Sequence, residues 1–464
     1  AMLPSLAVSA IYNDGDIIAF VYTILLLLAV GFPLISLKPY SQNIYTRDGF
    51  AIVAFGWILV SFFGSLPFYF SGAIPLLIDG FFEAVSGFTT TGASILKEIE
   101  GLPRGILFWR SFTHWVGGMG VLVLTLAILP SVGAGTLKIM KAESPGPNPG
   151  KLVPRMGKTA KLLYGIYLII TVAQIVLLFI SGMPLYDSFI HTFGTVGTGG
   201  FSSMNTSVGA YNNVYSEVII TVFMLICGAN FSLHYQFMKG NIRALFKDEE
   251  FRFYISVVGV SILLITINLY GNIFASLGES LRHSSFQVAS IITTTGYSST
   301  NFDKWPVFSK MILFFLMFVG GCAGSTGGAI KNIRILLLLK SMKTELMRII
   351  HPKAVYPVKI GGKAVDETAL SEIKSFFFMY MFVFVVAVLA VSLDGFDIVT
   401  TLSSVAATLG NIGPGFAMVG PMGNFSAMSA FSKIILSFAM LIGRLEIYPI
   451  LLLTMPSFWK KVNI

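Results

Sequence analysis

The chain has 464 residues, of which 55% are hydrophobic and only 11% are charged, and its mean hydropathy is +0.80. Soluble domains carry roughly 25% charged residues, so this composition excludes a water-soluble protein and indicates a chain that crosses a membrane many times. The net charge of +9 does not indicate nucleic-acid binding, because the basic residues are concentrated in a few loops between apolar segments.

Residues 1–48 are predicted to form an N-terminal transmembrane region. The apolar stretch 1–12 is too short to span a bilayer and has no basic segment typical of a signal peptide. We expect it to be the outer half of a helix whose first part precedes residue 1. The first complete span is predicted at residues 17–37.

From residue 49 onward, one pattern occurs four times: a long apolar span, a short apolar segment, a break containing glycine, and a second long span. We predict repeats at 49–131, 160–240, 252–340 and 374–457. The first spans are expected at 50–70, 162–180, 253–274 and 376–393. The short segments are expected at 80–91, 187–199, 284–295 and 398–412. The second spans are expected at 105–129, 214–238, 307–339 and 431–453.

The short segments cannot cross the membrane, because about 12 helical residues reach only about 18 Å, roughly half of the hydrocarbon core. They are therefore predicted to be re-entrant helices that enter the membrane and turn back. Two full crossings in each repeat give all four repeats the same orientation. The predicted fold is an all-α membrane protein with a pseudo-fourfold axis along the membrane normal, which disfavours an inverted-repeat carrier.

Lysine and arginine predict the orientation in the membrane. They are concentrated in the loops that join the repeats, for example Lys138, Lys141 and Lys151 in one loop and Lys340 and Lys353 in another. Since cytoplasmic loops carry an excess of basic residues, the breaks are expected to face outward and the C-terminus to be cytoplasmic.

The four breaks are the most informative feature of the chain. Their glycines Gly92, Gly200, Gly296 and Gly413 occupy equivalent places in the repeats. Backbone carbonyls can replace the water around a cation, and glycine allows the backbone to turn them to one side. We predict a cation site made by Thr90, Thr91, Gly92, Thr198, Gly199, Gly200, Thr294, Thr295, Gly296, Asn411, Ile412 and Gly413. Close helix packing is the alternative for one such segment, but four in equivalent places favour the site.

Polar residues also recur nine positions before each glycine, as Glu83, His191, Gln287 and Ser404. They stand in otherwise apolar stretches. We expect them to pack behind the cation site and to form hydrogen bonds with the backbone there. A proton-transfer role for His191 is the less favoured alternative.

Two further features lie after the third and fourth breaks. Gly320, Gly321, Gly324, Gly327 and Gly328 fall within nine residues of one long apolar run, where each glycine costs a helix roughly 1 kcal/mol. This predicts a broken helix with a mobile loop, rather than a close-packed glycine stripe.

Arg444 is a charge within the apolar run 434–453, so it must face protein or a water-filled cavity. We predict that it points at the axis below the breaks, near the glycine-rich loop. A structural ion pair with an acid on another helix is the alternative.

These motifs resemble the Trk/Ktr/HKT superfamily of potassium transporters, and most closely its bacterial TrkH/TrkG branch. The resemblance covers essentially the whole chain. It is carried by Ser86-Gly87-Phe88-Thr89-Thr90-Thr91-Gly92-Ala93, Trp115-Val116-Gly117-Gly118-Met119-Gly120, Ser144-Pro145-Gly146-Pro147, the run 320–328 and Gly443-Arg444-Leu445-Glu446-Ile447-Tyr448-Pro449.

The resemblance implies four M1–P–M2 repeats, with a filter glycine in each and two extra N-terminal helices. Gly92 stands where sodium-selective relatives carry serine, whereas Asn411-Ile412-Gly413-Pro414 departs from the threonine-rich pattern. The family further implies a gating loop at 320–328, a gating role for Arg444, a homodimer, and a cytosolic TrkA-like RCK nucleotide-binding regulator.

The predicted function is therefore uptake of K⁺, and with it Rb⁺, across the bacterial inner membrane, with membrane lipid as a further partner and without an organic cofactor, a nucleic-acid partner or enzyme activity. A Na⁺- or H⁺-coupled K⁺ carrier of the same fold is the main alternative. An intramembrane enzyme is disfavoured, because no paired acids or histidine clusters occur at membrane depth.

Overall fold

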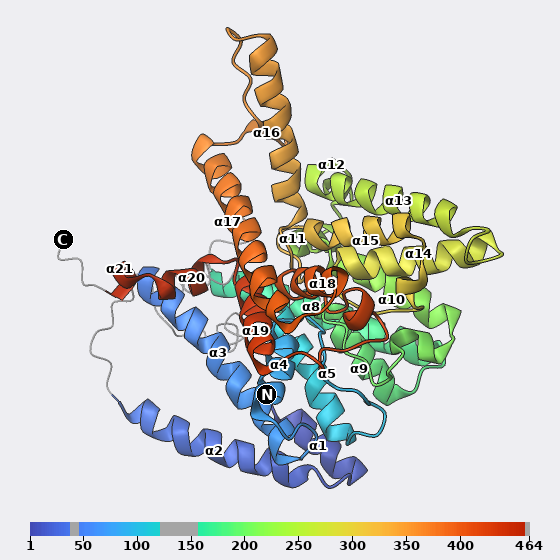
Figure 1. Ribbon diagram of the computed structural model, residues 1–464, viewed down its shortest axis with the longest axis vertical. Helices are drawn as coiled ribbons and strands as arrows, with labels where there is room; N and C mark the ends of the chain where they lie inside the picture. The colour runs from blue at the N-terminus through green and yellow to red at the C-terminus, as the bar shows by residue number, and fades with distance from the viewer. Residues whose placement is uncertain (38–45, 121–155, 460–464) are drawn as a thin grey trace.

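The computed structural model describes residues 1–37, 46–120 and 156–459, and Figure 1 shows their arrangement. The helices are α1 (Leu3–Tyr12), α2 (Ile17–Ser36), α3 (Thr46–Phe70), α4 (Leu77–Phe88), α5 (Arg104–Gly118), α8 (Met156–Ile180), α9 (Leu185–Val196), α10 (Val214–Cys227), α11 (Phe231–Met238), α12 (Arg243–Lys247), α13 (Glu249–Leu269), α14 (Leu277–Ile292), α15 (Val307–Val319), α16 (Asn332–Ile350), α17 (Glu367–Val391), α18 (Ile398–Leu409), α19 (Ala430–Arg444), α20 (Tyr448–Thr454) and α21 (Pro456–Trp459). The two strands are β1 (Lys359–Ile360) and β2 (Lys363–Ala364).

The described residues are mostly helical, as expected, with one short antiparallel hairpin formed by β1 and β2. Within the described residues, α2, α3, α8, α13 and α17 are long and apolar enough to cross a membrane unbroken. Helices α10 and α11 would together make a sixth crossing, bent by 100° at Gly228–Asn230. Leucine and phenylalanine are exposed along these helices, for example Phe378 and Leu389, as expected of a surface in contact with lipid.

The four short helices α4, α9, α14 and α18 are 12, 12, 16 and 12 residues long, too short to cross the hydrocarbon core. Each lies beside the long helix that precedes it. Helix α14 begins at Leu277, earlier than the predicted residue 284, because Ser276 caps it by accepting a hydrogen bond from the backbone N–H of Glu279 at 3.1 Å.

The second long span of the repeats differs most from the prediction. The expected span 214–238 is divided between α10 and α11, and the expected span 431–453 between α19 and α20. The run 307–339 is broken between α15 and α16, where a break was predicted. Helix α5 ends at Gly118, and the rest of the first repeat's second span lies outside the described residues.

The predicted span 17–37 is present as α2, and the short apolar stretch 1–12 contains α1. Helix α1 packs on α5, and the Asp14 carboxylate accepts a hydrogen bond from the Arg104 backbone N–H at 3.0 Å. Helix α2 lies along the edge of the molecule and is mostly exposed (Figure 1).

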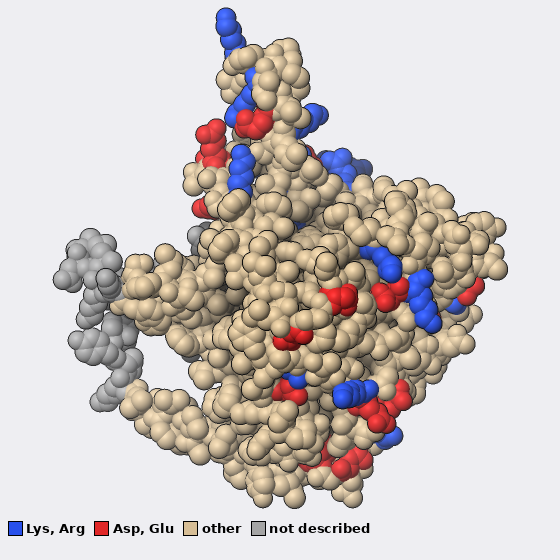
Figure 2. Space-filling view, in the orientation of Figure 1, with Lys and Arg blue, Asp and Glu red and all other residues tan. Residues whose placement is uncertain are grey.

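Basic side chains gather at the end of the molecule formed by α16 and over α12, while most of the visible surface is uncharged (Figure 2). Helix α16 extends well beyond the main bundle (Figure 1). The predicted basic loop with Lys138, Lys141 and Lys151, and the motif at Ser144–Pro147, lie outside the described residues.

Candidate functional site

The four breaks share one backbone conformation. Two residues before each glycine, the chain enters the left-handed region, with φ of 56° at Thr90, 57° at Thr198, 58° at Thr294 and 54° at Asn411. The glycines that follow have φ of 82° at Gly92, 80° at Gly200, 84° at Gly296 and 101° at Gly413. Positive φ is uncommon for non-glycine residues, so its recurrence at the equivalent residue of all four breaks shows that the breaks are structurally equivalent. The fourth break keeps this conformation although its sequence departs from the others.

The residue between these two positions is held by the short helix before it. In each break its backbone N–H donates to a carbonyl in the last turn of that helix. The bonds are Thr91 to Ser86 at 2.9 Å, Gly199 to Gly194 at 2.7 Å, Thr295 to Ser290 at 2.8 Å and Ile412 to Ala407 at 2.8 Å. The helix end thus fixes the position of the carbonyl that precedes each glycine.

These four carbonyls and the four glycines form a closed ring. A Cβ atom built on each glycine would overlap the carbonyl oxygen of the next break, at less than 3.0 Å in every case. The contacts run from Gly92 to the oxygen of Gly199, from Gly200 to that of Thr295, from Gly296 to that of Ile412, and from Gly413 back to that of Thr91. Every repeat therefore contributes one carbonyl and one glycine, and no larger residue fits at any of the four glycines.

A small cavity of about 80 Å³ lies at one side of this ring, and all four glycines line it. The predicted cation-site residues are thus brought together around one point from segments far apart in the sequence. Carbonyl oxygens so arranged can replace the hydration shell of a cation without adding a titratable group. The C-terminal ends of the short helices also meet here and favour positive charge.

The polar residues that recur before the glycines hold the chain after each break. Glu83 accepts hydrogen bonds from the Ser94 hydroxyl and the Ile95 N–H, both at 2.9 Å. His191 Nε2 contacts the Ser202 hydroxyl at 3.0 Å, and the Gln287 amide donates to the Tyr297 carbonyl at 3.2 Å. In the fourth repeat Ser403 has this role, accepting from the Phe416 N–H at 2.9 Å, whereas Ser404 donates to Thr401 in its own helix.

Arg110 is a residue of the site that the sequence reasoning missed. Its Nε donates to Glu83 at 2.6 Å, its Nη1 donates to the Ser202 carbonyl at 3.0 Å, and its guanidinium lies over the Phe201 ring at 3.5 Å. Both charged side chains are almost fully buried. Arg110 thereby ties the first break to the second, at the cavity beside the ring. A charge inside an apolar run, the signal that identified Arg444, also marks Arg110.

The glycine-rich loop between α15 and α16 lies against the other side of the ring. The Gly328 N–H donates to the Thr294 hydroxyl at 2.7 Å, and the Ala329 N–H donates to the Gly410 carbonyl at 3.0 Å. A Cβ on Gly327 would lie 2.9 Å from the Thr293 carbonyl oxygen. The predicted loop thus packs directly on the third and fourth breaks, and its glycines allow this close approach.

The loop is also bound to the second repeat. The Cys322 N–H donates to the Gly228 carbonyl at 2.8 Å, and the Phe231 N–H donates to the Gly324 carbonyl at 3.0 Å. Both partners lie at the bend between α10 and α11, the break that hydropathy did not predict.

Arg444 reaches this loop from the end of α19. Its Nη1 donates to the Thr326 carbonyl at 2.8 Å, and its Nη2 donates to the carbonyls of Gly117 and Gly118 at 2.6 and 2.8 Å. Glu446 pairs instead with Arg334 at 2.5 Å. Arg444 therefore links the loop of the third repeat to the end of α5 in the first repeat.

Comparison with known proteins agrees with these observations. Residues 17–461 match the family model TrkH, described as a cation transport protein. The chain is 42% identical to the Trk system potassium uptake protein TrkH of Salmonella typhimurium, over 99% of this chain and 96% of that one. It is 35% identical to the Trk system potassium uptake protein TrkG of Escherichia coli, with the same two shares covered. The structure is similar to the crystal structure of the potassium transporter TrkH from Vibrio parahaemolyticus, with a TM-score of 0.88, 38% identity, and 99% and 96% of the two chains covered.

Proposed function

Because this chain belongs to the TrkH family of cation transport proteins, we propose that it takes up potassium ions through the ring of carbonyls at its four breaks. It is a membrane transporter and not an enzyme. The transported ion is K⁺, with Rb⁺ as its closest substitute in size and charge, and the chain carries it across the inner membrane of a bacterium.

The observation that supports this proposal most directly is the ring closure. The oxygens of Thr91, Gly199, Thr295 and Ile412 each approach the glycine of the neighbouring break. We propose that these oxygens, with the carbonyls of Thr90, Thr198, Thr294 and Asn411, bind the ion as it passes. Selectivity then depends on a spacing that the left-handed turns and the bonded N–H groups maintain.

We propose that the loop 320–328 closes the path on the side of the ring opposite the cavity. Its hydrogen bonds to Thr294 and Gly410 support this role. Arg444 stabilises the closed position through Thr326 and adds a positive charge that repels a cation there.

The remaining parts of the proposal concern orientation and assembly. The basic surface around α16 (Figure 2) is cytoplasmic by the positive-inside rule. The ring's cavity then faces outward. A cytosolic RCK-type nucleotide-binding regulator contacts that surface and controls the loop, and the transporter works as a homodimer.

Ion flux in liposomes that contain the purified chain tests the function. A K⁺ gradient alone should drive uptake, with Rb⁺ replacing K⁺ and Na⁺ passing far more slowly. Uptake that requires a Na⁺ or H⁺ gradient would show the coupled carrier instead. The absence of any K⁺ flux from folded protein, with and without such gradients, would contradict both forms of transport.

A further inference from the structure

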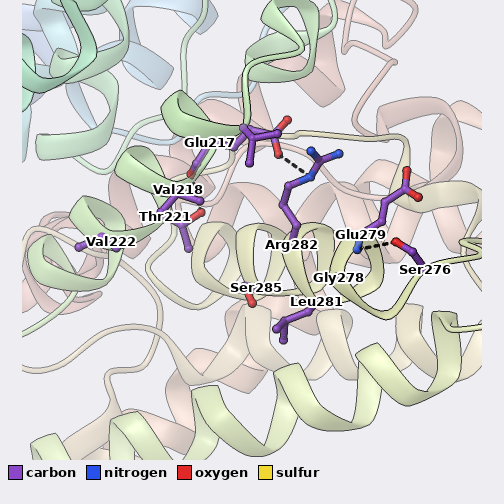
Figure 3. A pocket seen from close by; sticks show the side chains of 11 residues that line it. Glu217, Val218, Thr221, Val222, Ser276, Gly278, Glu279, Leu281, Arg282 and Ser285 are labelled. Atoms are coloured by element: carbon purple, nitrogen blue, oxygen red, sulfur yellow. Dashed lines mark hydrogen bonds and ion pairs between the residues drawn. The ribbon is translucent and has the colours of Figure 1, made fainter. Parts of the chain in front are cut away.

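A groove of about 750 Å³ lies between α10 and α14, away from the ring and the loop. One part of it is charged, with Glu217, Glu279 and Arg282, and the rest is mostly apolar. Figure 3 shows Arg282 rising from α14 toward Glu217 on α10, with the Glu279 carboxylate on the same side. We propose that this groove binds one phospholipid with a primary-amine headgroup, phosphatidylethanolamine, a site beyond the transport function proposed above.

The charged part of the groove has unused capacity for hydrogen bonds. Glu217 Oε2 and Arg282 Nε are 3.3 Å apart, and both atoms are buried, yet among the described residues neither makes a hydrogen bond. Charge-assisted bonds between such groups are usually about 2.7–2.9 Å long. Arg282 Nη2 contacts His283 at 3.0 Å, whereas Nη1 has no bonded partner in the part of the chain that the structure describes. Since Oε2 and Nε are buried against each other, Arg282 Nη1 and the exposed Glu279 carboxylate are the groups placed to bind a further polar group.

The charges match a zwitterion. A guanidinium binds phosphate through parallel N–H bonds, so Arg282 can hold a lipid phosphate. Two carboxylates, Glu217 and Glu279, can accept the N–H bonds of a primary ammonium. The quaternary amine of phosphatidylcholine has no N–H to donate, and phosphatidylglycerol has no cation at all. The groove therefore favours phosphatidylethanolamine over both.

The apolar part of the groove is suited to acyl chains. Val214, Val218 and Val222 lie four residues apart on α10, and each is about half exposed. Leu281 on α14 is exposed to the same degree. Glu217 and Arg282 lie within the first two turns of their helices. Val218 and Val222 therefore continue from the charged part along α10 into the membrane, while Val214 lies at the start of the helix, before Glu217. This amphipathic stripe is continuous with the lipid-facing surface, which favours a lipid over a second protein chain.

Native mass spectrometry of the full chain in detergent tests the site, with palmitoyl-oleoyl phosphatidylethanolamine, phosphatidylcholine and phosphatidylglycerol as separate probes. We expect one ethanolamine lipid to bind per chain, with an apparent Kd about tenfold or more below those of the other two, because it gains charge-assisted bonds that they lack. Arg282→Gln and Glu217→Gln should each remove this preference. Arg348→Gln is the matched control, because it removes an arginine from the exposed pair with Glu345, and the preference should remain.

Val222→Trp provides a second test that leaves the ion pair intact. The indole should fill the apolar part of the groove and weaken ethanolamine lipid binding, while the melting temperature stays close to that of the wild type. If Arg282→Gln does not fold, Val222→Trp still tests whether the ethanolamine lipid binds in this groove. Equal affinity for the three lipids would overturn the proposal. So would a loss of dimer mass in Val222→Trp with unchanged lipid binding, because the groove would then be an interface between two copies.

Discussion

At the scale of single residues, the ring excludes side chains at four positions. A Cβ on Gly92 would overlap the oxygen of Gly199, and φ of 82° is itself unfavourable for a residue with a side chain. Gly92→Ser should therefore displace one carbonyl in four and reduce discrimination against Na⁺ in liposome flux. Gly165→Ser is the control, since a Cβ there meets nothing within 4 Å. An unchanged K⁺/Na⁺ ratio in Gly92→Ser would remove Gly92 from the ion path.

The pair of Glu83 and Arg110 offers a prediction about stability. Removing one partner of a buried ion pair leaves an uncompensated charge, which typically costs about 3–5 kcal/mol. Glu83→Ala should thus lower the free energy of unfolding by about that amount, measured by denaturant titration in detergent. Glu345→Ala, in the exposed pair with Arg348, should change it by less than about 1 kcal/mol. Similar effects of the two variants would contradict the structural role given to Glu83.

Arg444 gives a prediction about basal flux. Its bonds to Thr326, Gly117 and Gly118 are made by the guanidinium, so Arg444→Ala should release the loop and raise K⁺ flux without loss of the fold. Arg444→Lys keeps the charge but loses the planar fork of the guanidinium that reaches these carbonyls, and it should raise the flux less. Arg348→Ala, an exposed arginine, serves as the control. An inactive and unstable Arg444→Ala protein would instead indicate a purely structural residue.

At the scale of elements, the loop 321–327 can be removed without separating its ends. A Cβ on Gly320 would lie 2.7 Å from the Gly328 oxygen, so α15 and α16 already approach each other at the base of the loop. Deletion of Gly321 to Gly327 eliminates the bonds of Cys322, Gly324 and Thr326 to the other repeats. It should raise basal K⁺ flux and weaken control by the regulator.

The control for this deletion is removal of Gly361 and Gly362, the turn between β1 and β2, which shortens a loop away from the ring. That variant should keep the basal flux of the wild type. A fall in flux from the folded 321–327 deletion would indicate that the segment is packing and not a gate.

The sequence predicted the elements unequally well. Hydropathy identified the long spans, and the recurring glycines identified the breaks, because both signals are repeated in the chain. Hydropathy did not predict the bend at Gly228–Asn230, since these three residues barely change the mean hydropathy of the run 214–238. The bend depends on contacts with Cys322 and Gly324, almost a hundred residues later in the chain.

The same reasoning explains two other differences. The predicted segment 284–295 left out Arg282 and His283, which belong to α14 and face Glu217 and Ser299 on other parts of the chain. Glu83 was recognised as polar and recurrent, but its partner Arg110 could not be assigned, because nothing in the sequence shows which helices pack together. Residue patterns that repeat along the chain could be predicted from the sequence, whereas ion pairs and hydrogen bonds between different helices could not.

At the scale of the whole molecule, the ring joins all four repeats at one point. A bound ion would therefore contribute to the stability of the complete fold, by RT ln(1 + [K⁺]/Kd) or about 2.7 kcal/mol at a hundred times Kd. The apparent melting temperature in detergent should rise with K⁺ concentration and respond much less to Na⁺ at the same ionic strength.

The variant Gly200→Ser tests whether this effect comes from the ring, since its Cβ would overlap the Thr295 oxygen. In this variant the melting temperatures in K⁺ and in Na⁺ should become nearly equal, because the added side chain displaces one of the four carbonyls. Gly259→Ser, at the middle of α13 where a Cβ meets nothing within 4 Å, should keep the difference between the two melting temperatures. Equal melting temperatures of the wild type in K⁺ and Na⁺, across a range of concentrations that saturates transport, would mean that the four repeats do not share one K⁺ site at this ring.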